Sequence, residues 1–359
     1  MNCKNFLTGL ASGLFFCLQM TYACWTTEAF EPKAPAKDVL HILGFYYGNG
    51  ENILIREAEG NLELLYRYAE EDKCFAKANR YPLSKLHFDS YTINEAGPLG
   101  GSETPVHFDR DPDGYGITCR VGGHMYTRAF FGYTQGERQK VYVLPSHTEE
   151  EWTKLRTEAD AAVMPKKLQQ GLAVELVNAK SIAGLSLKSV YGGQDNLFKH
   201  ALYDNAELYV ARQVAEALTK VQESLARYGY GLILYDAYRP WHISKLATLA
   251  LPQNSKGLLE DPERQGSPHN TGLAVDVSLV DVTTGEALEM PRAFDEPSLR
   301  QFAAYAGGTS QQRYRRELLR SAMQAQGFKA SATEWWHFEL GKISSYAHFN
   351  TAFAALNNE

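Results

Sequence analysis

The stretch Gly266-Ser-Pro-His-Asn-Thr-Gly-Leu-Ala-Val-Asp276-Val-Ser-Leu279 carries the residues on which the fold and the chemistry of this chain depend. His269 and Asp276 stand seven residues apart in it. The histidine precedes a flexible Asn-Thr-Gly link, and the aspartate lies in the apolar run 273–280, which is typical of a buried strand. An imidazole and a carboxylate placed in this way are candidate metal ligands.

A second segment near the C-terminus, Glu334-Trp-Trp-His337-Phe-Glu-Leu340, adds another imidazole and a spare carboxylate. Catalytic zinc sites use three nitrogen or oxygen ligands from the protein and leave one position for water. We therefore predict that His269, Asp276 and His337 bind one Zn²⁺ per chain and that Glu334 is the general base. Residues three apart on a regular strand point to opposite faces, so Glu334 must sit on a bulge or just before the strand.

Each of these residues also has an ordinary structural explanation. A histidine in an apolar strand is usually a hydrogen-bonded core residue, Asp276 could form a turn or cap, and Glu334 could be a surface charge. The two segments together, both strand-like and both flanked by Gly or Trp, favour a metal site over three separate explanations.

Length and composition limit the classes of protein to consider. A chain of 359 residues with 44% hydrophobic and 22% charged residues is typical of a soluble globular protein with two domains. The net charge of -6 provides no basic surface for nucleic acid, so we expect no nucleic-acid partner.

Residues 1–23 have the pattern of a secretory signal peptide. Lys4 precedes a mostly apolar run, 6–20, and the small residue Ala23 suits a cleavage site. The run is too short for a confident transmembrane span. We therefore expect an exported protein, periplasmic or extracellular.

Cleavage after Ala23 would place Cys24 first. A lipid-modified Cys24 would attach the protein to a membrane, although Thr21 and Tyr22 fit a bacterial lipoprotein signal poorly. An odd number of cysteines in an exported protein suggests one pair and one leftover thiol. Cys74 and Cys119 lie in the same half of the chain, so we expect a disulfide between them.

After a linker, 24–37, residues 38–146 show the signals of a small β-barrel-like domain. Strand-like runs at 52–56 and 62–66 flank Glu-Gly-Asn, a turn sequence that predicts a β-hairpin. Regularly spaced short strands with Gly-containing turns suggest a barrel or sandwich. The segment loosely resembles the lipocalin-like β-domains appended to some secreted hydrolases.

The remaining chain alternates helical and strand patterns. Residues 147–170 are expected to form a helical connector that Thr148 caps, and amphipathic spacing predicts a helix over 207–228. Residues 231–235 form a buried-strand pattern that leads into Asp236-Ala-Tyr-Arg239-Pro240. A further helix is expected over 313–326. The fold class predicted for the whole chain is α+β.

Residues 171–353 resemble the D-alanyl-D-alanine dipeptidases, including the vancomycin-resistance type, and the corresponding domain is expected to span 171–355. These are zinc peptidases related to the D,D-carboxypeptidases and to the hedgehog signalling domain. The resemblance rests on three motifs: Asp236-Ala-Tyr-Arg-Pro240, Ser267-Pro-His-x4-Ala-Val-Asp276 and Glu334-Trp-Trp-His337. It implies a zinc D,D-peptidase domain with a central antiparallel sheet and flanking helices.

The resemblance also implies site roles. His269, Asp276 and His337 would be the zinc ligands, with Glu334 as base and Arg239 as transition-state stabiliser. Met290-Pro-Arg-Ala-Phe-Asp295 resembles a family segment whose aspartate faces the substrate ammonium, and Ser267 falls where the family binds the substrate carboxylate. Tyr191 corresponds to a substrate-binding tyrosine of the family, although Gly192, Gly193 and Leu197 depart from the family's motif around it.

Three functions stay open on these grounds. The favoured one is hydrolysis of D-Ala-D-Ala to two D-alanine molecules. The second is a D,D-carboxypeptidase or endopeptidase that acts on peptidoglycan stem peptides, which export would suit. The third is a non-catalytic zinc-containing binding module, which would not need Glu334. For Arg239 the alternative to catalysis is an ion pair with Asp236 that holds the turn.

Overall fold

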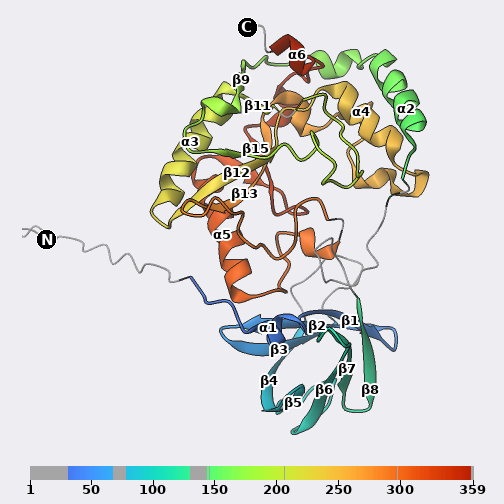
Figure 1. Cartoon of the computed structure of the whole chain (residues 1–359), viewed down its shortest axis with the longest axis vertical. Coiled ribbons are helices and arrows are strands. Elements are labelled where there is room, and N and C mark those ends of the chain that lie inside the picture. The colour runs from blue at the N-terminus through green and yellow to red at the C-terminus, as the bar shows by residue number, and fades with distance from the viewer. Residues whose placement is uncertain are drawn as a thin grey trace, which may run out of the picture. The chain divides into compact units, whose positions relative to one another are not determined.

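The computed structural model describes residues 31–67, 78–129, 144, 146–205, 207–296 and 298–356 (Figure 1). All of these except residue 31 belong to one compact unit, 32–359. The expected signal peptide, Cys24 and Cys74 lie outside the described residues, so export and lipidation stay predictions. Within the described part of the chain, no helix has both the length and the apolar character that a bilayer span requires.

The N-terminal part is a closed antiparallel barrel that follows a one-turn helix, α1 (Lys37–Leu40). Its strands are β1 (Gly44–Gly48), β2 (Glu51–Ala58), β3 (Asn61–Tyr66), β4 (Asn79–His87), β5 (Ser90–Ile93), β6 (Thr104–Arg110), β7 (Gly116–Val121) and β8 (His124–Ala129). Pairing of β1 with β8, for example Tyr46 opposite Arg128, closes the barrel and leaves no free sheet edge. The barrel-like prediction for this part is confirmed.

Side chains pack the barrel interior. Because side chains alternate along a strand, every second residue points inward. The aromatic residues Tyr46, Phe108 and Tyr126 are almost completely buried there, together with aliphatic residues from β2 and β3. The interior is therefore a hydrophobic core built from the alternation visible in the sequence.

The prediction of a disulfide between Cys74 and Cys119 is wrong, because Cys119 is a free cysteine. Strand alternation turns Cys119 into the barrel core, where it is 0% exposed and opposite Phe108 in the β6–β7 pair. Burial raises the pKa of the thiol far above its usual value. Cys119 therefore acts as a small apolar core residue.

The C-terminal part is built around a five-stranded sheet in the order β10-β12-β13-β15-β14. Its strands are β10 (Ser186–Leu187), β12 (Tyr230–Asp236), β13 (Ala274–Asp281), β14 (Phe328–Ala330) and β15 (His337–Leu340). Only the short β10 pairs in parallel, with β12, and the other pairs are antiparallel as expected. A separate ribbon pairs β9 (Leu176–Asn178) with β11 (Tyr209–Ala211).

Helices flank this sheet, as the predicted fold class requires. They are α2 (Glu149–Ala161), α3 (Arg212–Ala226), α4 (Trp241–Ala250), α5 (Ser310–Ala325) and α6 (Phe353–Leu356). Short 3-10 turns cover Lys166–Gln169, Ala179–Ser181, Gln253–Leu258, Pro268–Thr271, Leu299–Gln301 and Ile343–Ser345. In the C-terminal part, α3 lies against β12, and α2 packs on α4 (Figure 1). Helix α5 lies against β14.

Two helix boundaries differ from the sequence-based expectation. The helix predicted over 207–228 begins only at Arg212, because Tyr209–Ala211 pairs with β9 instead. The apolar spacing could not separate a strand from a first helical turn, and the tertiary pairing decides. Helix α5 begins earlier than residue 313, because Thr309 caps it by accepting a hydrogen bond from the Gln312 N–H. Thr148 caps α2 as predicted.

Candidate active site

Three elements bring His269, Asp276 and His337 together. His269 lies in the 3-10 turn Pro268–Thr271, Asp276 lies on β13, and His337 is the first residue of β15. The β13–β15 register places Asp276 directly opposite His337. Gly272 joins the turn to β13 at φ 74°, and a Cβ there would lie 2.5 Å from Leu176 Cδ2, so a glycine is required.

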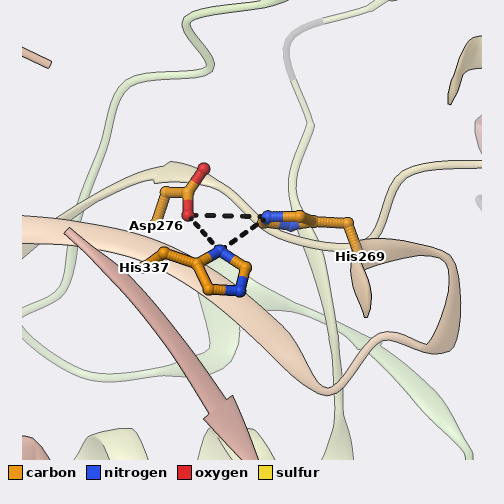
Figure 2. Close-up of side chains that lie close together, drawn as sticks. All are labelled: His269, Asp276 and His337. Atoms are coloured by element: carbon orange, nitrogen blue, oxygen red, sulfur yellow. Dashed lines mark hydrogen bonds and ion pairs between the residues drawn. The ribbon is translucent and has the colours of Figure 1, made fainter. Parts of the chain in front are cut away.

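The three side chains converge on one point (Figure 2). His269 Nε2 lies 3.3 Å from His337 Nδ1 and 3.5 Å from Asp276 Oδ1, and His337 Nδ1 lies 2.9 Å from Asp276 Oδ1. Ligand atoms about 2.0–2.1 Å from a tetrahedral zinc ion are about 3.3 Å apart. The donor set and its spacing therefore fit a single small divalent ion.

Hydrogen bonds behind the imidazoles select the nitrogens that face this point. His269 Nδ1 donates to the Ala237 carbonyl at 2.7 Å, which leaves Nε2 as the acceptor. His337 Nε2 lies 3.5 Å from Glu339 Oε1, which leaves Nδ1 inward. Histidine ligands are commonly oriented by carbonyl or carboxylate partners of this kind. Burial opposes ionisation of Asp276, but the two imidazoles hold the pKa of this carboxyl far below its usual range.

Glu334 lies in the turn immediately before β15, so its place beside His337 needs no bulge in the strand. The His337 N–H donates to the Glu334 carbonyl at 3.3 Å across this turn, and both tryptophans between them are buried. Burial raises the pKa of Glu334 to about 7. A carboxylate with a pKa near neutrality is suited to accept and return a proton.

The Arg239 guanidinium is buried and held by two partners. Nη2 donates to Asp236 Oδ2 at 2.5 Å, and Nε donates to the Tyr203 hydroxyl at 3.4 Å. Tyr203 also donates to the other Asp236 oxygen. Asp236 Oδ2 lies 3.6 Å from His269 Nδ1, so the ion pair extends to the triad. The ion pair considered as the structural alternative is thus present at the site itself.

Tyr191 and Asp295, which are far apart in sequence, are brought together. The Tyr191 hydroxyl donates to Asp295 Oδ1 at 3.1 Å, and the Leu197 N–H donates to Oδ2 at 2.7 Å. Burial raises the pKa of Asp295 to about 6. The Arg239 guanidinium lies 5.0 Å from the centre of the Tyr191 ring, which links this pair to the ion pair with Asp236.

Ser267 stands at the start of the turn that carries His269. Its N–H donates to Asn270 Oδ1 at 2.8 Å, and its buried hydroxyl has no hydrogen-bond partner among the described residues. A buried hydroxyl without a protein partner is available to a ligand.

Comparison with known proteins agrees with this arrangement. Residues 173–355 match the model of the peptidase M15 family, described as D-ala-D-ala dipeptidase. That match covers half of the chain and contains the whole triad. The chain belongs to the D-Ala-D-Ala dipeptidase family.

Members of this dipeptidase family from several bacteria are similar to the C-terminal half. The D-alanyl-D-alanine dipeptidase of Escherichia coli K12 is 32% identical over 167 residues, 45% of this chain and 82% of the relative. That of Enterococcus faecium is 33% identical over 147 residues, covering 36% and 71% of the two chains. That of Streptomyces coelicolor is 29% identical over 168 residues, covering 40% and 83%. The protein is therefore a hydrolase of the peptidase class.

Two residues in this peptidase site were not found by reading the sequence. Glu339 lies two positions after His337 on β15, and period-two alternation alone could have placed both on one face. Tyr203 gives no such signal, because it reaches Asp236 from a loop 33 residues earlier in the chain.

Proposed function

We propose that this peptidase is a zinc-dependent dipeptidase that hydrolyses D-Ala-D-Ala to two molecules of D-alanine. The observation that carries the proposal is the convergence of two imidazole nitrogens and a carboxylate oxygen on one point, with Glu334 in the adjacent turn. A purely structural metal site is normally closed by four protein ligands, whereas three leave a position open. This difference argues against a non-catalytic binding module.

His269, Asp276 and His337 would hold the ion, one per chain. Zinc, when bound, lowers the pKa of water and polarises a carbonyl group. Glu334 would take the proton from the attacking water and pass it to the leaving amine, and its pKa of about 7 suits both transfers.

Arg239 would stabilise the oxyanion that develops on the scissile carbonyl. Its planar fork stays charged at any working pH, and Asp236 and Tyr203 already fix its orientation. Preorganised donors of this kind are effective because they need no rearrangement when charge develops.

A dipeptide needs a charge partner at each end. We assign the substrate ammonium to Asp295, which Tyr191 and the Leu197 N–H hold in place. The terminal carboxylate is assigned to the unpartnered hydroxyl of Ser267. In this proposal Tyr191 positions Asp295.

The substrate assignment is tested by comparing D-alanine release from three compounds. We expect free D-Ala-D-Ala to be cleaved with the highest kcat/KM, because only in this compound does the residue before the scissile bond carry a free ammonium for Asp295. N-acetyl-D-Ala-D-Ala is the matched control that lacks this charge, and a stem pentapeptide ending in D-Ala-D-Ala tests the carboxypeptidase alternative. Faster release from the pentapeptide would show that the enzyme acts on peptidoglycan stems instead.

Arg239→Lys is expected to lower kcat by about 10²–10³, the usual loss for one oxyanion donor, with a smaller change in KM. The buried pair with Asp236, which is 0% exposed, leads us to expect a lower melting temperature as well.

The matched control for this substitution is Arg212→Lys. Arg212 forms an exposed ion pair with Glu175, and surface pairs contribute little, so kcat and melting temperature should both stay close to wild type. An Arg239→Lys protein that melts early but retains normal kcat would assign Arg239 to structure alone.

We further propose that the protein is exported, on the pattern of residues 1–23. N-terminal sequencing of the protein from its native host should find Cys24 as the first residue. A mature chain that still begins at Met1 would overturn this proposal.

A further inference from the structure

Arg292 is a buried cation with unused donors. It lies in the segment Met290-Pro-Arg-Ala-Phe-Asp295 and is only 4% exposed. Its Nε donates to the Ala293 carbonyl at 2.6 Å. Neither Nη1 nor Nη2 has a hydrogen-bond acceptor among the residues that the structure describes. Nearly every buried polar group in a folded protein has a partner, so this exception requires an explanation.

Other buried arginines of the described ranges do not share this feature. Arg56 donates to Glu63, Arg239 to Asp236 and Arg316 to the Tyr305 carbonyl through terminal nitrogens. Arg292 instead stacks on Trp336, with its guanidinium carbon 4.5 Å from the ring centre. Stacking offsets part of the loss of hydration, but it supplies no acceptor for the N–H groups.

The position of Arg292 ties it to the active site. Trp336 directly precedes His337, and Phe294 contacts Trp336 with ring centres 5.2 Å apart. Phe294 also contacts the ring of Tyr191, at 6.5 Å, and Tyr191 holds Asp295. Arg292 and Asp295 therefore lie on one segment. Through the Phe294 ring, this segment contacts Trp336, next to His337, and Tyr191, which holds Asp295.

The carboxylates near Arg292 belong to Asp295, Glu296 and Glu334, and none of them accepts a hydrogen bond from its terminal nitrogens. Glu296 accepts hydrogen bonds from Arg300 and Ser298, and both oxygens of Asp295 accept bonds from Tyr191 and Leu197. Burial lowers the pKa of Arg292 to about 9, so the side chain keeps its charge at neutral pH. A planar guanidinium with two free terminal nitrogens fits a carboxylate of a ligand.

We infer that Arg292 binds a side-chain carboxylate when the N-terminal residue of a dipeptide carries one, so that the enzyme prefers an acidic first residue to the corresponding uncharged amide. The inference rests on the proposed function, because it uses Asp295 as the partner of the substrate ammonium. In an acidic residue such as D-glutamate, the ammonium and the side-chain carboxylate are joined by a short carbon chain. Arg292 and Asp295, three positions apart, supply one partner for each. The terminal carboxylate of the substrate is assigned to Ser267, as above.

The test compares kcat/KM for D-Glu-D-Ala and D-Gln-D-Ala, which have nearly the same shape and differ in charge. We expect the whole wild-type protein to prefer D-Glu-D-Ala at least about tenfold, since charge-assisted hydrogen bonds are stronger than neutral ones. Arg292→Gln should abolish this preference. The matched control is Arg264→Gln, which removes the same charge from an exposed position and should leave the preference intact.

The outcomes separate the inference from the function on which it rests. Equal kcat/KM for the two dipeptides in wild type, together with cleavage of D-Ala-D-Ala, would overturn the inference alone. An undiminished preference in Arg292→Gln would overturn it too. Failure to cleave any dipeptide would overturn the proposed function and the inference together. The wild-type comparison decides the question even if Arg292→Gln does not fold.

Discussion

Glu334→Gln is expected to lower kcat for D-Ala-D-Ala by about 10²–10⁴, the range that general acid–base catalysis contributes, while the protein keeps its metal ion. The amide has the shape of the carboxylate but cannot accept the proton of water. Metal should be retained because the ion has its own three ligands, and Glu334 is not one of them. Elemental analysis and turnover are measured on the same preparation.

The matched control is Glu286→Gln, an exposed carboxylate in the turn after β13, at the opposite end of that strand from the triad. It should behave like wild type. Loss of metal together with activity in Glu334→Gln would make Glu334 a ligand, and normal kcat would remove it from the proton transfers.

His337→Ala is expected to lose both the metal ion and all measurable hydrolysis. It removes one of three ligands and leaves Asp276 without the imidazole that faces it across the β13–β15 pair. Catalytic zinc sites use three protein ligands, and this variant keeps only two, so we expect its loss of activity to exceed that of Glu334→Gln.

The control for this variant is His87→Ala, an exposed histidine at the end of β4. Bound zinc per chain and kcat should match wild type. If His337→Ala retained one equivalent of zinc and normal turnover, the ion would have to bind elsewhere and the triad would not be the active site.

Much of this site could be predicted from local sequence. Asp276 lies in an apolar run and His337 in a short strand-like segment, so each local pattern was readable without tertiary information. Strand geometry alone left two possible positions for Glu334, on a bulge or just before the strand. The structure places it before the strand. The barrel likewise followed from hairpins whose strands are neighbours in the chain.

The remaining features depend on contacts between distant segments. Tyr203, Asp236 and Arg239 form one buried network, but nothing in the loop around Tyr203 indicates which strand end it meets. Cys119 is a free thiol because the face of β7 that carries it turns into the barrel core. The number of cysteines in the sequence does not indicate which face of the strand turns inward. The late start of α3 depends on pairing with strand β9, which lies earlier in the chain: Tyr209 pairs with Asn178, 31 residues before it.

Zinc titration of the metal-free protein tests the central claim most directly. D-alanine release from D-Ala-D-Ala is measured as Zn²⁺ is added and plotted against zinc bound per chain. We predict no hydrolysis without metal, a linear rise, and a plateau at one ion per chain. Full hydrolysis by metal-free protein, or no hydrolysis with one equivalent bound, would contradict the account.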